Sequence, residues 1–127
     1  MQKIGLEESL ATFNDHWRPR IVGELNGQHI KLVKFQGEFV WHHHLEEDEM
    51  FLVLHGSFQM DYRDPLGCER SLALSQGEFV IVPRGTEHRP RSADECHVLL
   101  FEPAGTLNTG NVRSDRTVQN PPRLMGQ

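Results

Sequence analysis

Hydrophobic and polar residues alternate along most of this chain in short runs, with almost no helical period. The runs are rich in Val, Ile, Phe and Leu, and glycines such as Gly37, Gly56 and Gly77 separate them. Such short runs with regular turn signals predict β-strands. Seven or eight of them indicate an all-β sandwich or closed barrel, with strands expected at residues 20–25, 29–35, 38–44, 49–55, 57–64, 69–74, 78–83 and 96–102.

Two local signals add to this pattern. The pair Asn26 and Gly27 lies between two β-rich runs, and Asn-Gly is a strong sequence signal for a tight antiparallel hairpin. The spacing of Leu6, Leu10 and Phe13 is typical of one short helix. We therefore expect an N-terminal arm with a short helix at residues 1–20.

Beyond Pro103 the composition changes to Asn, Thr, Gly, Pro and Arg with few large apolar residues. Such a segment cannot form a core of its own. Residues 104–127 are therefore expected to be a tail that is unattached, packs on the barrel or packs on a partner subunit. The barrel itself would occupy residues 21–103.

The length and charge of the chain disfavour several classes of function. One domain accounts for 127 residues, and 18 acidic against 13 basic side chains give a net charge of −5, which disfavours binding to nucleic acids and anionic membranes. The apolar runs are too short to cross a bilayer, and the N-terminus lacks a signal-peptide pattern. We expect a cytoplasmic protein in which Cys68 and Cys96 are free thiols.

Candidate chemistry is concentrated at residues 42–49. In a strand, His42 and His44 would share one face about 7 Å apart, with His43 on the other face. Such a pair is either a metal-binding pair or a polar strand edge. Glu46, Glu47 and Asp48 are expected in a solvated turn.

Two further residues extend this cluster. Glu49 begins an apolar run, where a buried carboxylate needs an ionic or hydrogen-bonding partner. His88 follows a tight turn at Pro83 and Gly85 after another apolar run.

These residues resemble the two motifs of the cupin superfamily. The first motif is matched, in order, by Gly37, His42, His44, Glu49 and Gly56. The second is matched by Gly77, Pro83, Gly85 and His88, with Ser92 where the family has Asn. Gly37 lies one residue early, which affects only the turn, and the Asn is not a ligand in the family. The resemblance covers roughly residues 25 to 102.

The resemblance implies a cupin barrel, a jelly-roll-like double-stranded β-helix. It also implies one divalent metal ion, Fe, Mn, Ni or Zn, held by His42, His44, Glu49 and His88. In octahedral geometry these four ligands leave two positions open. The remaining histidines match no motif position and are expected to be ordinary surface or core residues: His16, His29, His43, His55 and His97.

Open metal positions favour a metal-dependent enzyme acting on a small oxygen-bearing organic molecule, of dioxygenase, isomerase or lyase type. The alternatives are a non-catalytic small-molecule binding or sensing protein and a purely structural metal. Alternation predicts an apolar pocket wall from Val40, Phe51 and Val53, with contributions from Phe79 or Val80 and from Val98 or Leu99. Catalytic residues, the substrate and the metal stay open at this point.

Two expectations concern the surface. The arginines near His88 either bind an anionic group at the barrel mouth or are solvated charges: Arg84, Arg89 and Arg91. Small cupins are commonly homodimers, and a partner can cover exposed edge strands. We expect a homodimer to which residues 1–20 or 103–120 contribute.

Overall fold

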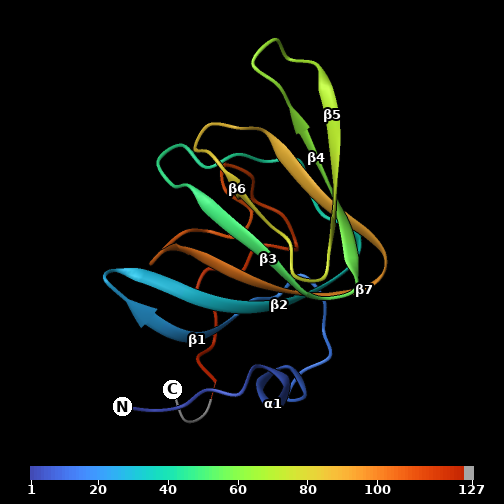
Figure 1. Ribbon diagram of the computed structural model, residues 1–127. Helices are drawn as coiled ribbons and strands as arrows, with labels where there is room; N and C mark the ends of the chain where they lie inside the picture. Colours follow the sequence, from blue (N-terminus) through green and yellow to red (C-terminus); the bar gives the residue numbers. More distant parts are fainter. Residues whose placement is uncertain (125–127) are drawn as a thin grey trace.

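The computed structural model describes residues 1–124, and the last three residues of the expected tail lie outside this range. Within residues 1–124 it contains one helix and seven strands, and all pairings between the strands are antiparallel (Figure 1). The elements are α1 (Leu6–Leu10), β1 (Arg20–Leu25), β2 (Gln28–Glu38), β3 (Glu49–His55), β4 (Ser57–Arg63), β5 (Glu69–Ser75), β6 (Phe79–Val82) and β7 (His88–Pro103). The all-β class with a short N-terminal helix is confirmed.

The long strand β7 connects the two parts of the sheet. Its first residues pair with β4, and its second half pairs with both β2 and β3. The strand order is therefore β1-β2-β7-β3-β6. Strand β4 pairs with the start of β7, and β5 pairs with β4. Side chains alternate between buried and more exposed along both halves of β7. Residues from its start and from its end therefore reach the interior of one barrel.

Two apolar clusters stabilise this arrangement. The interior cluster contains Phe35, Phe51 and Phe58, with Trp17 from the arm stacked on Phe35 at 4.4 Å between ring centroids. The second cluster lies where the arm covers the sheet and includes Leu10, Phe13, Val22 and Leu32. Burial of a large apolar side chain contributes about 1.5–3 kcal/mol, so the arm is an integral part of the fold.

The hairpin between β1 and β2 forms as predicted. Leu25 pairs with Gln28, and the two residues between them have positive φ angles, 51° for Asn26 and 76° for Gly27. Positive φ at both central positions defines a type I′ turn, whose twist matches that of the flanking strands.

The expected strand at residues 38–44 is wrong. Strand β2 ends at Glu38, and the chain up to Asp48 is irregular apart from one isolated bridge between His42 and His88. A register shift between Phe35 and Gly37 and the left-handed backbone of Gly37 (φ 87°) interrupt the regular pairing with β7, which ends at Glu38. His42 instead exchanges two backbone hydrogen bonds with His88, at 3.0 and 2.8 Å.

The segment after β7 packs on the barrel of its own chain. The Ile21 N–H donates to the Pro122 carbonyl at 2.9 Å, and the Leu124 N–H donates to the Ile21 carbonyl at 3.1 Å. Figure 1 shows this orange-to-red segment running past β1 toward α1. Thr106, Thr109 and Val118 of this segment are buried. Of the three expectations for the tail, packing on the barrel is the one that the structure shows.

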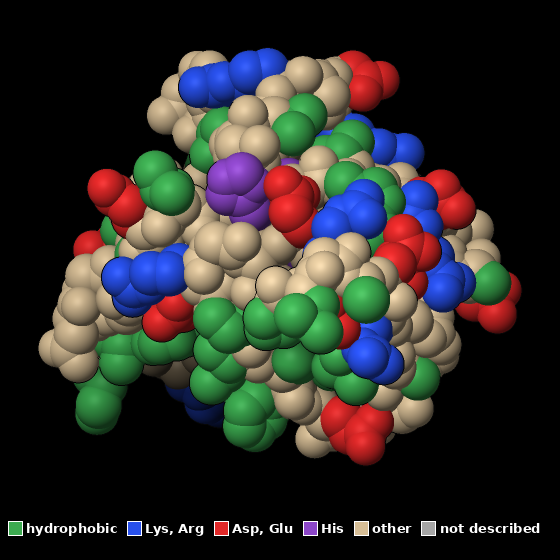
Figure 2. All heavy atoms as spheres, turned by 90° about the horizontal axis from the view of Figure 1, so that it is seen from above, with side chains coloured by type: hydrophobic (Ala, Val, Ile, Leu, Met, Phe, Trp, Pro, Cys, Tyr) green, Lys and Arg blue, Asp and Glu red, His purple; other side chains and the backbone are tan. Residues whose placement is uncertain are grey.

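The surface carries mixed charge. On the face seen in Figure 2, acidic and basic side chains lie next to one another, and hydrophobic groups gather in its lower half. Cys68 is exposed and Cys96 is buried, and both are free thiols as expected. No helix in residues 1–124 is long and apolar enough to span a membrane.

Candidate metal centre

Four side chains meet inside the barrel: His42, His44, Glu49 and His88. Each offers one nitrogen or oxygen atom, and these atoms all lie within 4.8 Å of one another. The side chains are almost fully buried, with residue exposures of 2, 4, 3 and 0% in the same order. Two come from the irregular segment after β2, one begins β3 and one begins β7, so three separate parts of the chain build the cluster.

Backbone carbonyls orient two of the imidazoles. His42 Nδ1 lies 2.8 Å from the Val40 carbonyl oxygen, and His88 Nδ1 lies 2.8 Å from that of Thr86. Because a carbonyl only accepts hydrogen bonds, Nδ1 carries the proton in both rings. The Nε2 atoms therefore keep their lone pairs, as metal coordination by a neutral imidazole requires.

The atoms that face the centre of the cluster lack other partners. Within residues 1–124, His44 Nε2, His88 Nε2 and Glu49 Oε1 are buried without a hydrogen bond. Glu49 Oε1 lies 2.9 Å from His44 Nε2 and 3.3 Å from His88 Nε2. Unpaired buried polar atoms are costly, and ligand atoms around a single ion lie about 3–4 Å apart. This donor set therefore fits a divalent metal.

The electrostatics also suit a cation. Burial lowers the pKa of His42 to about 3, so this imidazole is neutral at pH 7. Burial alone would raise the pKa of Glu49. The close approach of Glu102, His44 and His88 outweighs it and holds the pKa of Glu49 well below its usual value. The cluster thus combines a neutral imidazole with a carboxylate.

The other histidines and the arginines near His88 have partners outside the cluster. His43 contacts Glu87, His29 contacts Glu24, and His16 and His97 both contact Glu95, while His55 lies beside His97. Arg84 pairs with Asp48, and Arg89 and Arg91 share Asp61. Each arginine is therefore engaged in an ion pair, Arg89 also with Glu38 at 3.4 Å, so the alternative of a free anion-binding loop is not supported.

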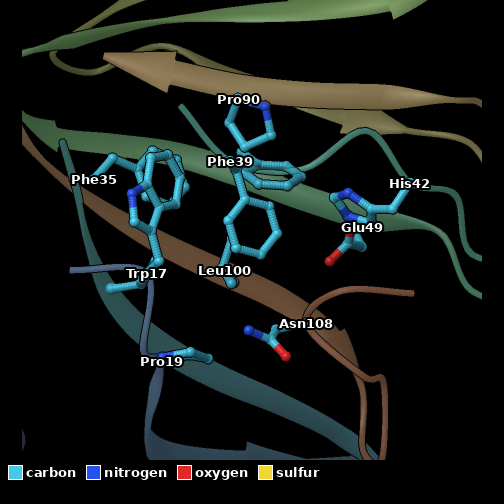
Figure 3. Close-up of a pocket in the computed structure, with 11 residues that line it drawn as sticks. Trp17, Pro19, Phe35, Phe39, His42, Glu49, Pro90, Leu100 and Asn108 are labelled. Carbon is cyan, nitrogen blue, oxygen red and sulfur yellow. The ribbon is translucent and has the colours of Figure 1, made fainter. Parts of the chain in front are cut away.

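A small cavity of about 30 Å³ adjoins the cluster. Figure 3 shows His42 and Glu49 on one side of it and aromatic and aliphatic side chains, including Phe39 and Leu100, on the other. This volume holds about two water molecules. The candidate centre therefore opens onto a space that is narrow and mostly apolar.

The predicted pocket wall is only partly correct. Phe51 lines the cavity, whereas Val53 and Val98 are buried in the core elsewhere and Phe79 is 60% exposed. Alternation along a strand missed Trp17 from the arm and Asn108 from the tail, which both line the cavity. Strand periodicity carries no information about segments that fold over a barrel end.

The comparisons with known proteins agree with this fold. A family model for the cupin domain matches residues 30–102, which is more than half of the chain. The uncharacterized protein YdbB of Bacillus subtilis (strain 168) is 37% identical over 71 residues. That match covers 56% of this chain and 59% of YdbB, so the chain spans less than two thirds of this curated relative.

Solved structures show the same architecture. A cupin-2 domain containing protein from Shewanella frigidimarina is 40% identical with a TM-score of 0.73, and the match covers 79% of this chain and 93% of that one. Hydroquinone 1,2-dioxygenase PnpCD, solved in complex with Fe3+, is 17% identical with a TM-score of 0.73 over 82% of this chain and 33% of that chain, a likeness of fold alone. The matched domain and the shared barrel show that this chain belongs to the cupin family.

Proposed function

We propose that this protein is a metal-dependent cupin enzyme acting on a small oxygen-bearing molecule, with one divalent ion held by His42, His44, Glu49 and His88. The observation that carries this proposal is the set of buried ligand-type atoms without other partners, next to a cavity. When bound there, an ion with open positions acts as a Lewis acid or, if it is redox active, binds dioxygen.

The cavity narrows the class of substrate. At about 30 Å³ it has room for dioxygen or for a single oxygen-bearing group of a larger molecule, but not for a whole aromatic ring. A substrate larger than this cavity would have to displace lining residues, among them Trp17 from the arm and Asn108 from the tail. We therefore favour dioxygenase-type chemistry, with isomerase and lyase reactions as the other members of the proposed class.

Iron is the metal that this proposal favours. PnpCD, which shares the fold, is a dioxygenase that was solved with Fe3+. Imidazole and carboxylate ligands suit iron, and they also suit Mn, Ni and Zn. The chemistry of the donor set thus leaves these four metals to be distinguished by measurement.

Elemental analysis of untagged protein tests the metal. We expect close to one equivalent of a single transition metal in the wild type and a loss of at least tenfold in the His42→Ala/His44→Ala double variant. His43→Ala is the matched control, because His43 lies between these residues but contacts Glu87. Equal metal content in the wild type and in the double variant would reject the proposed centre.

Turnover separates an enzyme from the alternative, a non-catalytic binding or sensing cupin. Protein loaded with Fe(II) is first exposed to nitric oxide, which reports an open coordination position through its paramagnetic resonance signal. Oxygen uptake is then measured with a panel of small hydroxy acids and keto acids. Consumption above the rate of free iron supports the enzyme, whereas binding that raises only the melting temperature would favour the binding protein.

We also propose a homodimer and a cytoplasmic location. The free edge strand β6 exposes Phe79 (60%) and Ile81 (56%), which a second copy could cover. Light scattering coupled to size exclusion checks the dimer, and fractionation of cells checks the location. A monomer across the micromolar range would contradict the dimer.

A further inference from the structure

Trp17 of the N-terminal arm lines the cavity beside the candidate metal centre. In Figure 3 it lies at the end opposite His42 and Glu49, with Phe39 between them. The ring centroids of Trp17 and Phe39 are 5.0 Å apart, and those of Phe39 and His42 are 5.4 Å apart. The indole therefore bounds the cavity at the end that faces away from the candidate ligands.

The indole of Trp17 is fixed from several sides. Its ring stacks on Phe35 at 4.4 Å between centroids, and the guanidinium of Arg116 from the tail lies 5.7 Å from the ring centroid. The indole N–H donates to the Gln36 carbonyl at 2.8 Å. Trp17 is only 3% exposed. Because the ring cannot turn aside without losing these contacts, it forms a rigid wall.

The backbone of Trp17 is in an unfavourable conformation. Its φ is 63°, in the left-handed region that bulky residues rarely adopt. Glycine would adopt this angle readily. Strained residues persist where the surrounding contacts over-determine them, and they are concentrated at active sites and ligand-binding sites. A tryptophan at a position that suits glycine indicates that the volume of its side chain is needed there.

We propose that Trp17 is the residue that determines substrate size at the candidate site, because its indole keeps the cavity at about 30 Å³ and so excludes aromatic acids. This inference rests on the proposed function and names the residue that limits the size of its substrate. Trp17 lies outside both sequence motifs and comes from a segment that precedes the barrel.

Removal of the indole should extend the cavity into space bounded by Phe35 and Phe39. An apolar cavity of about 150 Å³ accepts benzene, and an indole ring is larger than benzene. The vacated space is therefore large enough for the ring of an aromatic acid whose carboxylate points toward the candidate centre. Truncation of Trp17 should thus change which ligands bind, and not only how stable the protein is.

Three variants test this role. Trp17→Gly removes the indole and suits the left-handed backbone, whereas Trp17→Phe leaves a smaller ring and frees only part of the space. Trp41→Gly is the matched control, because the chain has two tryptophans and Trp41 does not line the cavity. Trp41 stacks instead against the guanidinium of Arg63, 4.4 Å from its ring centroid.

The first readout is the melting temperature with and without indole, which needs no metal. Indole at about ten times its dissociation constant should raise the melting temperature of Trp17→Gly by roughly 3–7 °C, because it refills the vacated space. At the same concentration the wild type and Trp41→Gly should shift by less than about 1 °C.

The second readout is the selectivity of protein loaded with cobalt(II). Azide and benzoate are titrated separately, and the visible absorption of the bound cobalt gives a dissociation constant for each. The preference for azide over benzoate should fall at least about tenfold in Trp17→Gly and stay within about threefold of the wild type in Trp41→Gly. A purely structural role of Trp17 would weaken the binding of both anions alike.

Each outcome bears on one part of the proposal. An unchanged preference in folded Trp17→Gly, or an equal indole shift in Trp41→Gly, would overturn the role of Trp17. If Trp17→Gly does not fold by circular dichroism, Trp17→Phe replaces it, with an expected fall in preference of at least about threefold. No cobalt binding by the wild type would overturn the metal centre of the proposed function, whereas the indole shift would still test Trp17.

Discussion

Single residues decide how closely the tail approaches the candidate centre. Gly110 has a φ of 55°, and a Cβ atom at this position would collide with the His43 carbonyl oxygen and lie 3.0 Å from Cδ2 of His42. Asn111 also contacts His43. Its N–H donates to the His43 carbonyl, and its Oδ1 accepts from the His43 N–H. Residues 110 and 111 thus hold the tail against the histidine segment.

Gly110→Ala should therefore destabilise the protein more than a similar change nearby. The left-handed backbone alone costs an alanine about 1–2 kcal/mol, and overpacking adds about 1–3 kcal/mol. Gly105→Ala is the matched control, since Gly105 has a φ of 88° but nothing within 4 Å of an added Cβ. Urea unfolding of both variants measures the difference, and equal losses would show that the tail yields without strain.

At the level of elements, the N-terminal arm places Trp17 in the cavity wall. Lys34 Nζ donates to the Phe13 carbonyl, the Trp17 N–H donates to the Lys34 carbonyl at 2.9 Å, and the indole N–H of Trp17 donates to the Gln36 carbonyl at 2.8 Å. His16 adds a contact to Glu95 on β7 at 2.8 Å. The arm is thus attached along β2 and β7 by polar contacts as well as by its apolar face.

The contact between the arm and β7 predicts a pH dependence. Hydrogen bonds from His16 and His97 lower the pKa of Glu95 to about 2, from 4.5. A carboxyl whose folded pKa is depressed contributes stability above about pH 4.5 and loses this contribution as the pH falls toward 2. Glu95→Gln should lower the free energy of unfolding at pH 7 by at most about 1 kcal/mol, because Glu95 is partly exposed.

Urea unfolding at pH 7 and at pH 3 checks this expectation. The difference between the wild type and Glu95→Gln should shrink at the lower pH. Adding His16→Gln to the Glu95→Gln variant should have little further effect, because the two residues share one contact. A difference that stays constant or grows on acidification would contradict the assigned role of Glu95.

For the molecule as a whole, a bound metal should contribute to stability. A ligand at 100 times its dissociation constant stabilises the folded state by about 2.7 kcal/mol. Removing the metal with a chelator should therefore lower the melting temperature by roughly 5–15 °C for a chain of this size, and restoring it should reverse the change. Differential scanning calorimetry makes the measurement.

Calorimetry with and without metal on two variants tests whether the stabilising ion binds at the candidate centre. His44→Ala should melt at the same temperature with and without metal, whereas His43→Ala should retain the metal-dependent shift. Both residues lie in one segment, but His44 faces Glu49 and His43 faces Glu87. A shift that persists in His44→Ala would place the stabilising ion elsewhere.

The sequence by itself determined the class of fold, the hairpin and the short helix. Alternation, Asn-Gly turn chemistry and helical spacing are local properties, and local sterics and burial of one face act on them directly. The sequence also singled out His42, His44, Glu49 and His88, which the structure brings within 4.8 Å of one another. Their role as metal ligands stays a prediction.

Only the tertiary structure decided what surrounds these residues. Glu102 and Lys31 form a buried ion pair because β7 pairs with β2. Trp17 and Asn108 line the cavity because the arm and the tail fold over the barrel. Strand register and the docking of terminal segments depend on packing between residues far apart in the chain, which no local pattern encodes. The small size of the cavity follows from the same packing.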